Sequence, residues 1–149
     1  MTERFEATIA EAIEKVRRMD ESARICAGRD AIAAIRAFFS GKGIKGGRAE
    51  KYLFFYFWAL AGADRSFSES EYAFLKQAAD IPYEYDDSLE KMRDANEFVT
   101  SDDDYDDVIE GLHKQRYKEC MLLAVLVVSA DKEITYTEKA RLFALLGEE

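Results

Sequence analysis

Two stretches of this chain repeat one another, and they set the strongest limit on its fold. Residues 51–79 align without a gap with residues 118–146 at a shift of 67, and six positions are identical: Lys51/Lys118, Ala63/Ala130, Asp64/Asp131, Glu71/Glu138, Ala73/Ala140 and Leu75/Leu142. Each copy has the pattern of an apolar helix, a short polar connection and an amphipathic helix. An apolar helix without a polar face must be surrounded by other elements. We therefore expect two helical hairpins that pack face to face with pseudo-twofold symmetry.

The rest of the chain also shows helical periodicity, and no segment alternates apolar and polar residues as a strand does. Thr2 is placed to cap the first helix, Gly28 is a candidate break in the second, and the glycines after residue 40 end that helix. The expected helices cover residues 2–19, 23–39, 48–63, 68–79, 87–98, 101–130 with a break near 111–114, and 135–146. The sequence predicts an all-α helical bundle that forms a single domain. Residues 1–46 form an N-terminal helical extension of this domain, and residues 47–149 form the repeat core.

Composition limits the classes of function. With 48% hydrophobic residues the chain can build a core, and its net charge of −9 argues against nucleic acid or an anionic membrane as the main partner. The longest apolar runs, residues 52–63 and 120–130, are shorter than the roughly 20 residues that a membrane-spanning helix needs, so we expect no direct membrane insertion. Cys26 and Cys120 belong to no CxxC pattern and lie in apolar stretches. We expect both to be buried and reduced, in a cytoplasmic protein.

The connection between the two helices of each copy carries a motif. It reads Ala-Asp-Arg-Ser-Phe-Ser-Glu-Ser-Glu at residues 63–71 and Ala-Asp-Lys-Glu-Ile-Thr-Tyr-Thr-Glu at residues 130–138. At these residues the chain resembles the TerB-like family, named for a tellurite-resistance protein, whose pattern is Ala-Asp-Gly-x-Ile-Ser-x-x-Glu between two helices. Arg65 and Lys132 stand where the family has Gly. The resemblance implies an all-helical fold, acidic residues that handle divalent cations, a role in stress-response or membrane-associated assemblies, and no enzyme activity.

Two interpretations of the motif carboxylates stay open. In each copy a hydroxyl residue precedes a glutamate by three positions, which is the spacing of a capping box at a helix start. The aspartate of each copy follows the end of an apolar helix, where the helix dipole disfavours a negative charge and either loop N–H groups or a bound cation would offset that cost. The second interpretation is a site for a divalent cation, Ca²⁺ or another, built from oxygen ligands. Its four residues would be Asp64, Glu71, Asp131 and Glu138.

Residues 84–110 contain most of the charge. They hold twelve acidic and two basic residues, a net charge of −10, whereas the remainder of the chain is nearly neutral. Five carboxylates within six residues exceed what helix capping needs, and they repel one another unless water, cations or a basic partner surrounds them. We therefore expect one negative surface. A protein partner that binds there would be basic and would contact Asp102, Asp103, Asp104, Asp106 and Asp107.

Few residues suggest catalysis. His113 is the only histidine and has no metal-binding spacing, so we expect it at the surface or at a helix end. Residues 41–48 combine glycines with basic residues but lack a Walker motif, which favours a flexible helix connection over an anion site. We expect a non-enzymatic interaction module that is either cation-responsive or purely structural. The alternatives are a helical protein that binds a small ligand with the aromatic helix of residues 52–63, and a helical hydrolase that holds a metal with paired carboxylates.

Overall fold

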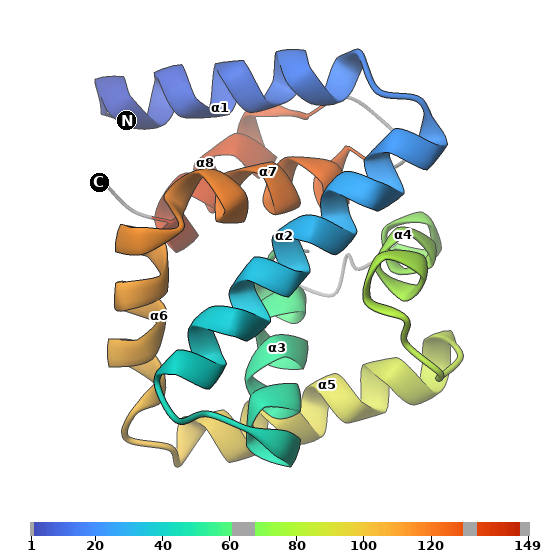
Figure 1. Ribbon diagram of the computed structural model, residues 1–149. Coiled ribbons are helices and arrows are strands. Elements are labelled where there is room, and N and C mark those ends of the chain that lie inside the picture. Colours follow the sequence, from blue (N-terminus) through green and yellow to red (C-terminus); the bar gives the residue numbers. More distant parts are fainter. Residues whose placement is uncertain (1, 61–67, 130–133, 147–149) are drawn as a thin grey trace.

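The computed structural model describes residues 2–60, 68–129 and 134–146, and every regular element within these ranges is an α-helix (Figure 1). The predicted all-α fold is confirmed. The helices are α1 (Glu3–Arg17), α2 (Glu21–Gly41), α3 (Gly46–Leu60), α4 (Glu69–Ala79), α5 (Tyr85–Thr100), α6 (Tyr105–Gln115), α7 (Tyr117–Val128) and α8 (Tyr136–Leu146).

Side-chain caps determine where the first two helices begin, and a close contact with α4 explains the glycine inside the second helix. Thr2 and Asp20 each accept a hydrogen bond from the backbone N–H three residues on, at 3.3 and 2.8 Å, so α1 and α2 begin as separate helices. The expected break at Gly28 is wrong, because α2 runs through it. Gly28 instead lies against α4, where a Cβ atom at this position would come within 2.7 Å of the Phe74 ring.

The break that the sequence predicts within residues 101–130 falls at Arg116, between α6 and α7 and just after the expected positions 111–114.

The glycine-rich connection after α2 is a defined turn. The N–H of Ile44 donates to the carbonyl of Phe39 at 2.9 Å, and that of Gly43 donates to the carbonyl of Ser40 at 3.1 Å. These two bonds form a Schellman motif, which satisfies carbonyl groups left open at a helix end. Gly43 has a φ of +80°, a conformation that residues with a side chain rarely adopt. The turn folds the buried Ile44 back onto the end of α2 and sets the start of α3.

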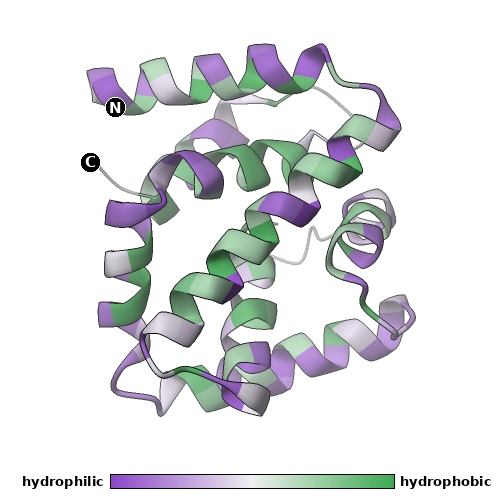
Figure 2. Ribbon diagram, viewed as in Figure 1, coloured by the Kyte–Doolittle hydropathy of each residue, from purple (hydrophilic) through white to green (hydrophobic). Residues whose placement is uncertain are grey.

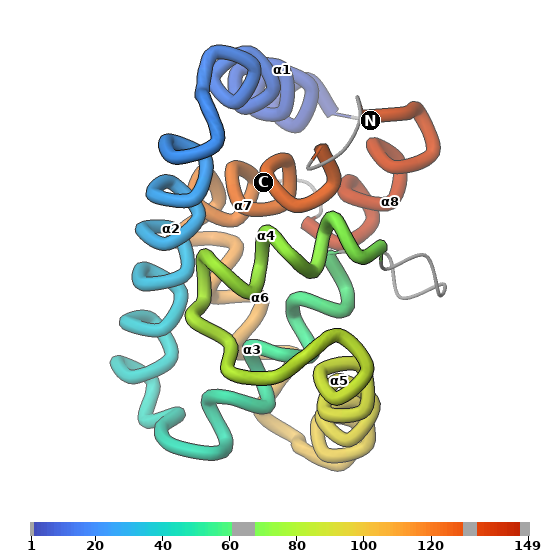
Figure 3. The backbone as a smooth tube through the Cα atoms, turned by 90° about the vertical axis from the view of Figure 1, so that its right-hand side faces the viewer, coloured from blue at the N-terminus to red at the C-terminus, as the bar shows by residue number. Residues whose placement is uncertain are grey.

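Two apolar helices form the centre of the molecule, as the sequence predicts. In α7 every residue from Leu123 to Val128 is at most 4% exposed, and Tyr52, Tyr56 and Phe57 of α3 are fully buried. Both α1 and α2 pack on α7, α4 packs on α2, α8 packs on α7, and α5 packs on α3. Figure 3 shows α3 between α2 and α5, and Figure 2 shows that α7 is largely hydrophobic whereas hydrophilic residues recur along α1 and α5. Within the described ranges, no helix combines the length and the apolar character needed to cross a membrane.

The repeat recurs in the local structure. Helices α4 and α8 each contain 11 residues, and their bounds differ by the same 67 positions as the sequence repeat. The equivalent residues Leu75 and Leu142 are both buried. The packing of the two helices differs, because α4 lies mainly against α2 whereas α8 lies mainly against α7.

The two cysteines differ in exposure. Cys120 is buried in α7, as expected, and Cys26 is exposed. The expectation that both are buried is therefore wrong for Cys26. The reason is the phase of α2, which buries the side that carries Gly28 and Ile32 and turns Cys26 toward solvent.

Candidate functional site

The glutamates of the repeat motif cap α4 and α8. Glu71 is 5% exposed, its Oε1 accepts a hydrogen bond from the N–H of Ser68 at 2.8 Å, and its own N–H donates to Ser68 Oγ at 3.0 Å. The second copy has the same pair of bonds, in which Glu138 Oε1 accepts from the N–H of Thr135 at 2.8 Å and the N–H of Glu138 donates to Thr135 Oγ1 at 3.2 Å. Both capping boxes predicted from the sequence are thus present.

The cation interpretation depends on two further residues, Asp64 and Asp131, which lie outside the described residues. Among the residues that the structure does describe, no three His, Cys, Asp or Glu side chains are grouped so that they could hold a metal ion. Glu71 and Glu138 already use Oε1 for capping. The four-carboxylate site therefore stays a prediction.

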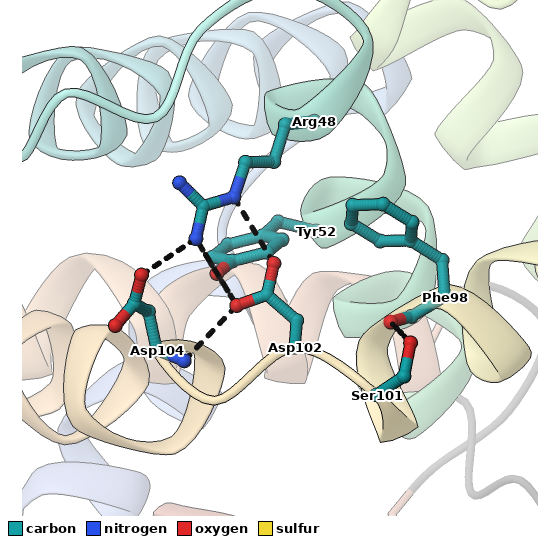
Figure 4. Close-up of polar contacts among 6 residues, drawn as sticks. All are labelled: Arg48, Tyr52, Phe98, Ser101, Asp102 and Asp104. Carbon is teal, nitrogen blue, oxygen red and sulfur yellow. Dashed lines mark hydrogen bonds and ion pairs between the residues drawn. The ribbon is translucent and has the colours of Figure 1, made fainter.

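Two of the five aspartates expected to contact a partner bind an arginine of the same chain. Asp102 lies in the connection between α5 and α6, and its carboxylate accepts from Arg48 Nε at 3.0 Å and from Arg48 Nη2 at 3.1 Å (Figure 4). The same Nη2 donates to Asp104 at 2.8 Å, and the Tyr52 hydroxyl donates to Asp102 at 2.8 Å. This cluster joins the start of α3 to the α5–α6 connection.

The electrostatics of the cluster follow from this geometry. The Asp102 side chain is only 8% exposed, and its hydrogen bonds from Arg48 lower the pKa of Asp102 to about 2. The same carboxylates raise the pKa of Arg48. Burial, together with the bond to Asp102, raises the pKa of Tyr52 to about 12. Arg48, the last basic residue of the 41–48 segment and part of the first turn of α3, thus belongs to a structural ion pair.

The rest of the acidic segment lies on the surface. Asp103, Asp106 and Asp107 are exposed and stay candidates for contact with a partner. On α5, four exposed carboxylates follow one another at helical spacing, on the side opposite to the buried Met92 and Ala95. We call these four residues the acidic stripe: Asp86, Glu90, Asp94 and Glu97.

A groove of about 810 Å³ opens between α2, α3 and the α4–α5 connection, within the size range of ligand-binding pockets. We call it the α2–α3 groove. Its floor is apolar, and the floor residues Ile32, Leu53 and Phe57 are at most 3% exposed. Ala33, Ala49 and other small residues line its sides. The groove therefore has room for an occupant, and the large apolar side chains of its floor are already covered by their neighbours.

The lining of the groove carries three basic residues and two acidic ones, Glu50 and Asp80, so its net charge is weakly positive. Arg29 donates to the carbonyl of Gln77 at 2.8 Å and lies 3.5 Å from an oxygen of Asp80. Arg36 of α2 and Lys45 at the start of α3 also line the groove, and neither side chain has a hydrogen-bond or ion-pair partner in the described part of the chain. The rim of the groove is not predicted by the sequence analysis above. The available signal was the seven-residue spacing of the two arginines on one face of α2.

A second group of titratable side chains lies in the core. His113 is in the last turn of α6 and is 7% exposed, and its Nε2 lies 2.8 Å from the hydroxyl of Tyr56. Burial lowers the pKa of His113 to about 4 and raises the pKa of Cys120, which interacts with the same hydroxyl, to about 12. The prediction of a helix end is correct for His113, but the side chain is not at the surface.

Comparison of the chain with protein-family models, curated proteins and solved structures gives no match.

Proposed function

We propose that this protein is a non-enzymatic, TerB-like interaction module and that its docking surface is the α2–α3 groove. The observation that carries the proposal is the pair Arg36 and Lys45, two basic side chains without partners among the described residues, on the rim of one groove. Cations left unpaired beside a concave surface favour the binding of an anionic group.

The TerB-like part of the proposal draws support from the repeat. The shift of 67 residues that relates the two sequence copies also relates the bounds of α4 and α8 and both capping boxes. The same shift relates α3 to α7 and α4 to α8. Two contacts between helices agree with this relation, because α3 contacts α8 and, correspondingly, α7 contacts α4. Contacts exchanged in this way are what a pseudo-twofold arrangement of two hairpins requires.

The groove favours an acidic peptide segment over a small apolar ligand. Its large apolar floor residues are already covered, so an apolar molecule would remove little further surface of these side chains from water, and burial is what binds such ligands. The rim of α2 from Arg29 to Ser40 extends over eleven residue steps, about 16 Å at the rise of an α-helix. A helix of about three turns with carboxylates along one face matches both the length and the charge of this rim.

The buried titratable group supports a non-enzymatic role. Catalysis by His113 or Cys120 would require a substrate to reach them, and these side chains are 7% and 0% exposed. With a pKa of about 12 for its thiol, Cys120 is protonated at neutral pH and is a poor nucleophile.

The test is a titration with a designed probe. A 15-residue alanine-based helical peptide with glutamates at positions i, i+4, i+8 and i+11 should bind, and amide shifts in the protein NMR spectrum should concentrate in α2 and α3. The double variant Arg36→Gln with Lys45→Gln should lose about tenfold in affinity, since each surface ion pair contributes up to about 1 kcal/mol. The control variant Lys15→Gln with Lys118→Gln removes the same charge from exposed positions of α1 and α7 and should bind as wild type does.

Two results would contradict the proposal. The first is an equal loss of affinity in both double variants, which would mean that the peptide senses only net charge. The second is equal binding of a peptide in which glutamine replaces every glutamate.

A further inference from the structure

The acidic stripe of α5 matches the α2–α3 groove in length and in charge. Asp86 and Glu97 are eleven residues apart, as are Arg29 and Ser40 on the groove rim, so each row extends about 16 Å along its helix. The stripe consists of four exposed carboxylates that have no ion-pair partner among the described residues, and the exposed Arg93 lies on the same face of α5, so this face carries four negative charges and one positive charge. The rim offers Arg36 and Lys45, which are likewise unpaired there.

The two surfaces of one molecule cannot meet each other. Helix α5 packs on α3, and α3 separates it from α2 (Figure 3). The stripe lies on the side of α5 that faces solvent, opposite to the buried Met92 and Ala95. It is therefore presented outward, away from the groove of its own chain.

We infer that the α2–α3 groove of one copy receives the acidic stripe of α5 from a second copy of this chain. The inference rests on the proposed function, because it uses the same groove and names its occupant. Acidic residues on the groove do not prevent this pairing: Asp80 is engaged by Arg29, which leaves Glu50 as the unpaired carboxylate of the lining beside Arg36 and Lys45.

The geometry determines the type of assembly. Groove and stripe are different surfaces, so the contact is heterologous, and each added copy still offers one free groove or one free stripe. Association should therefore continue beyond the dimer as concentration rises. Because the contact consists mainly of exposed charges, it should weaken as salt shortens the Debye length from about 30 Å at 0.01 M to about 8 Å at 0.15 M.

The experiment uses sedimentation equilibrium on the full chain and on two charge-reversed variants. The groove variant carries Arg36→Glu and Lys45→Glu, and the stripe variant carries Glu90→Lys and Asp94→Lys. At low ionic strength the average mass of wild type should rise with concentration above the 17.0 kDa of one chain, and each variant alone should stay at the monomer mass. In an equimolar mixture the intact stripe of the groove variant can meet the intact groove of the stripe variant, and the two reversed surfaces are again opposite in charge, so the mixture should regain association above the monomer mass.

The control variant Lys15→Glu with Lys118→Glu changes the charge by the same amount as the groove variant and should associate as wild type does. Circular dichroism of every variant checks that the helices are intact. The inference is overturned if wild type stays monomeric at low ionic strength, if the control variant loses association as the groove variant does, or if the mixed variants do not combine. A monomeric wild type that still binds the acidic probe peptide in the groove would overturn the second copy as occupant and leave the proposed function standing. A chain that does neither would overturn both.

Discussion

His113 should make the stability of this protein depend on pH. It is the only histidine in the chain, and burial lowers the pKa of its imidazole from 6.5 to about 4 in the native state. The native core provides a neutral environment of Tyr56 and apolar side chains, in which the imidazolium ion is poorly solvated. The unfolded chain has no such environment, and its histidine titrates near 6.5.

The sign and the size of the effect follow from the two pKa values. Below pH 6.5 the unfolded chain binds a proton that the native state excludes, so the free energy of unfolding falls as the pH falls. The contribution of His113 to the free energy of unfolding is fully present above about pH 6.5. It decreases between pH 6.5 and pH 4 and changes no further below about pH 4. The difference between the native and unfolded pKa values corresponds to about 3 kcal/mol in the free energy of unfolding, of which about 2 kcal/mol is lost by pH 5.

The assay compares urea unfolding of wild type and His113→Gln at several pH values between 4.5 and 8. Carboxylates titrate in both proteins, so the difference between their free energies of unfolding isolates the histidine. Between pH 7.5 and pH 5, the free energy of unfolding of wild type should fall by about 2 kcal/mol relative to that of His113→Gln. Parallel stability curves, or an NMR titration of the native protein that gives His113 a pKa near 6.5, would refute the reasoning.

Three further predictions concern the ion-pair cluster, the turn after α2 and the repeat motif. Asp102→Asn should lower the free energy of unfolding by about 1 kcal/mol, because it weakens the bonds from Arg48 and Tyr52, whereas the exposed neighbour Asp103→Asn should leave it within about 0.3 kcal/mol in the same urea assay. The contribution of Asp102 to the free energy of unfolding should be present above about pH 4 and disappear as the pH falls toward 2, because the native pKa is lowered to about 2. If the difference in free energy of unfolding between wild type and Asp102→Asn does not change over this range, the assignment is contradicted. Gly43→Ala should cost about 1 kcal/mol because of the positive φ at this position, and Gly41→Ala, where φ is ordinary and the added Cβ meets no atom, should be neutral or stabilising in thermal unfolding. If a divalent cation binds the repeat motif, calorimetric titration of wild type with Ca²⁺, Mg²⁺, Mn²⁺ and Zn²⁺ at physiological salt should give a defined stoichiometry that Asp64→Asn with Asp131→Asn removes; unchanged binding in that variant, or no binding by wild type, would end the cation hypothesis.

Local features of the fold could be predicted from the sequence because short-range interactions determine them. Thr2, the capping glutamates and the glycine turn act within a few residues, and each appears in the structure where the sequence places it. The apolar segments in α3 and α7 could be predicted as central for a similar reason, since a helix without a polar face must be covered on every side.

Other features could not be predicted because they depend on partners far along the chain. Asp102 reads as one more surface carboxylate until α3 brings Arg48 against it, across 54 positions. His113 is buried because α6 approaches α2 closely at Gly111, where a Cβ would lie 3.3 Å from the Phe38 ring, and because Tyr56 supplies a hydrogen bond. The α2–α3 groove likewise exists only once three elements have packed together, so its rim of Arg29, Arg36 and Lys45 has no local signature beyond helical spacing.

The most direct test of the central claim is to identify which groups touch when two copies associate. A carbodiimide joins a lysine amine to a carboxylate only when the two are in contact, and a mixture of unlabelled and ¹⁵N-labelled chains distinguishes links between copies from links within one. We predict that Lys45 of one copy becomes linked to Glu90, Asp94 or Glu97 of another, and that the yield falls as salt is added. Links between copies that omit Lys45, or that join it equally to Asp103, Asp106 and Asp107, would contradict the assignment of the groove as the docking surface for the stripe.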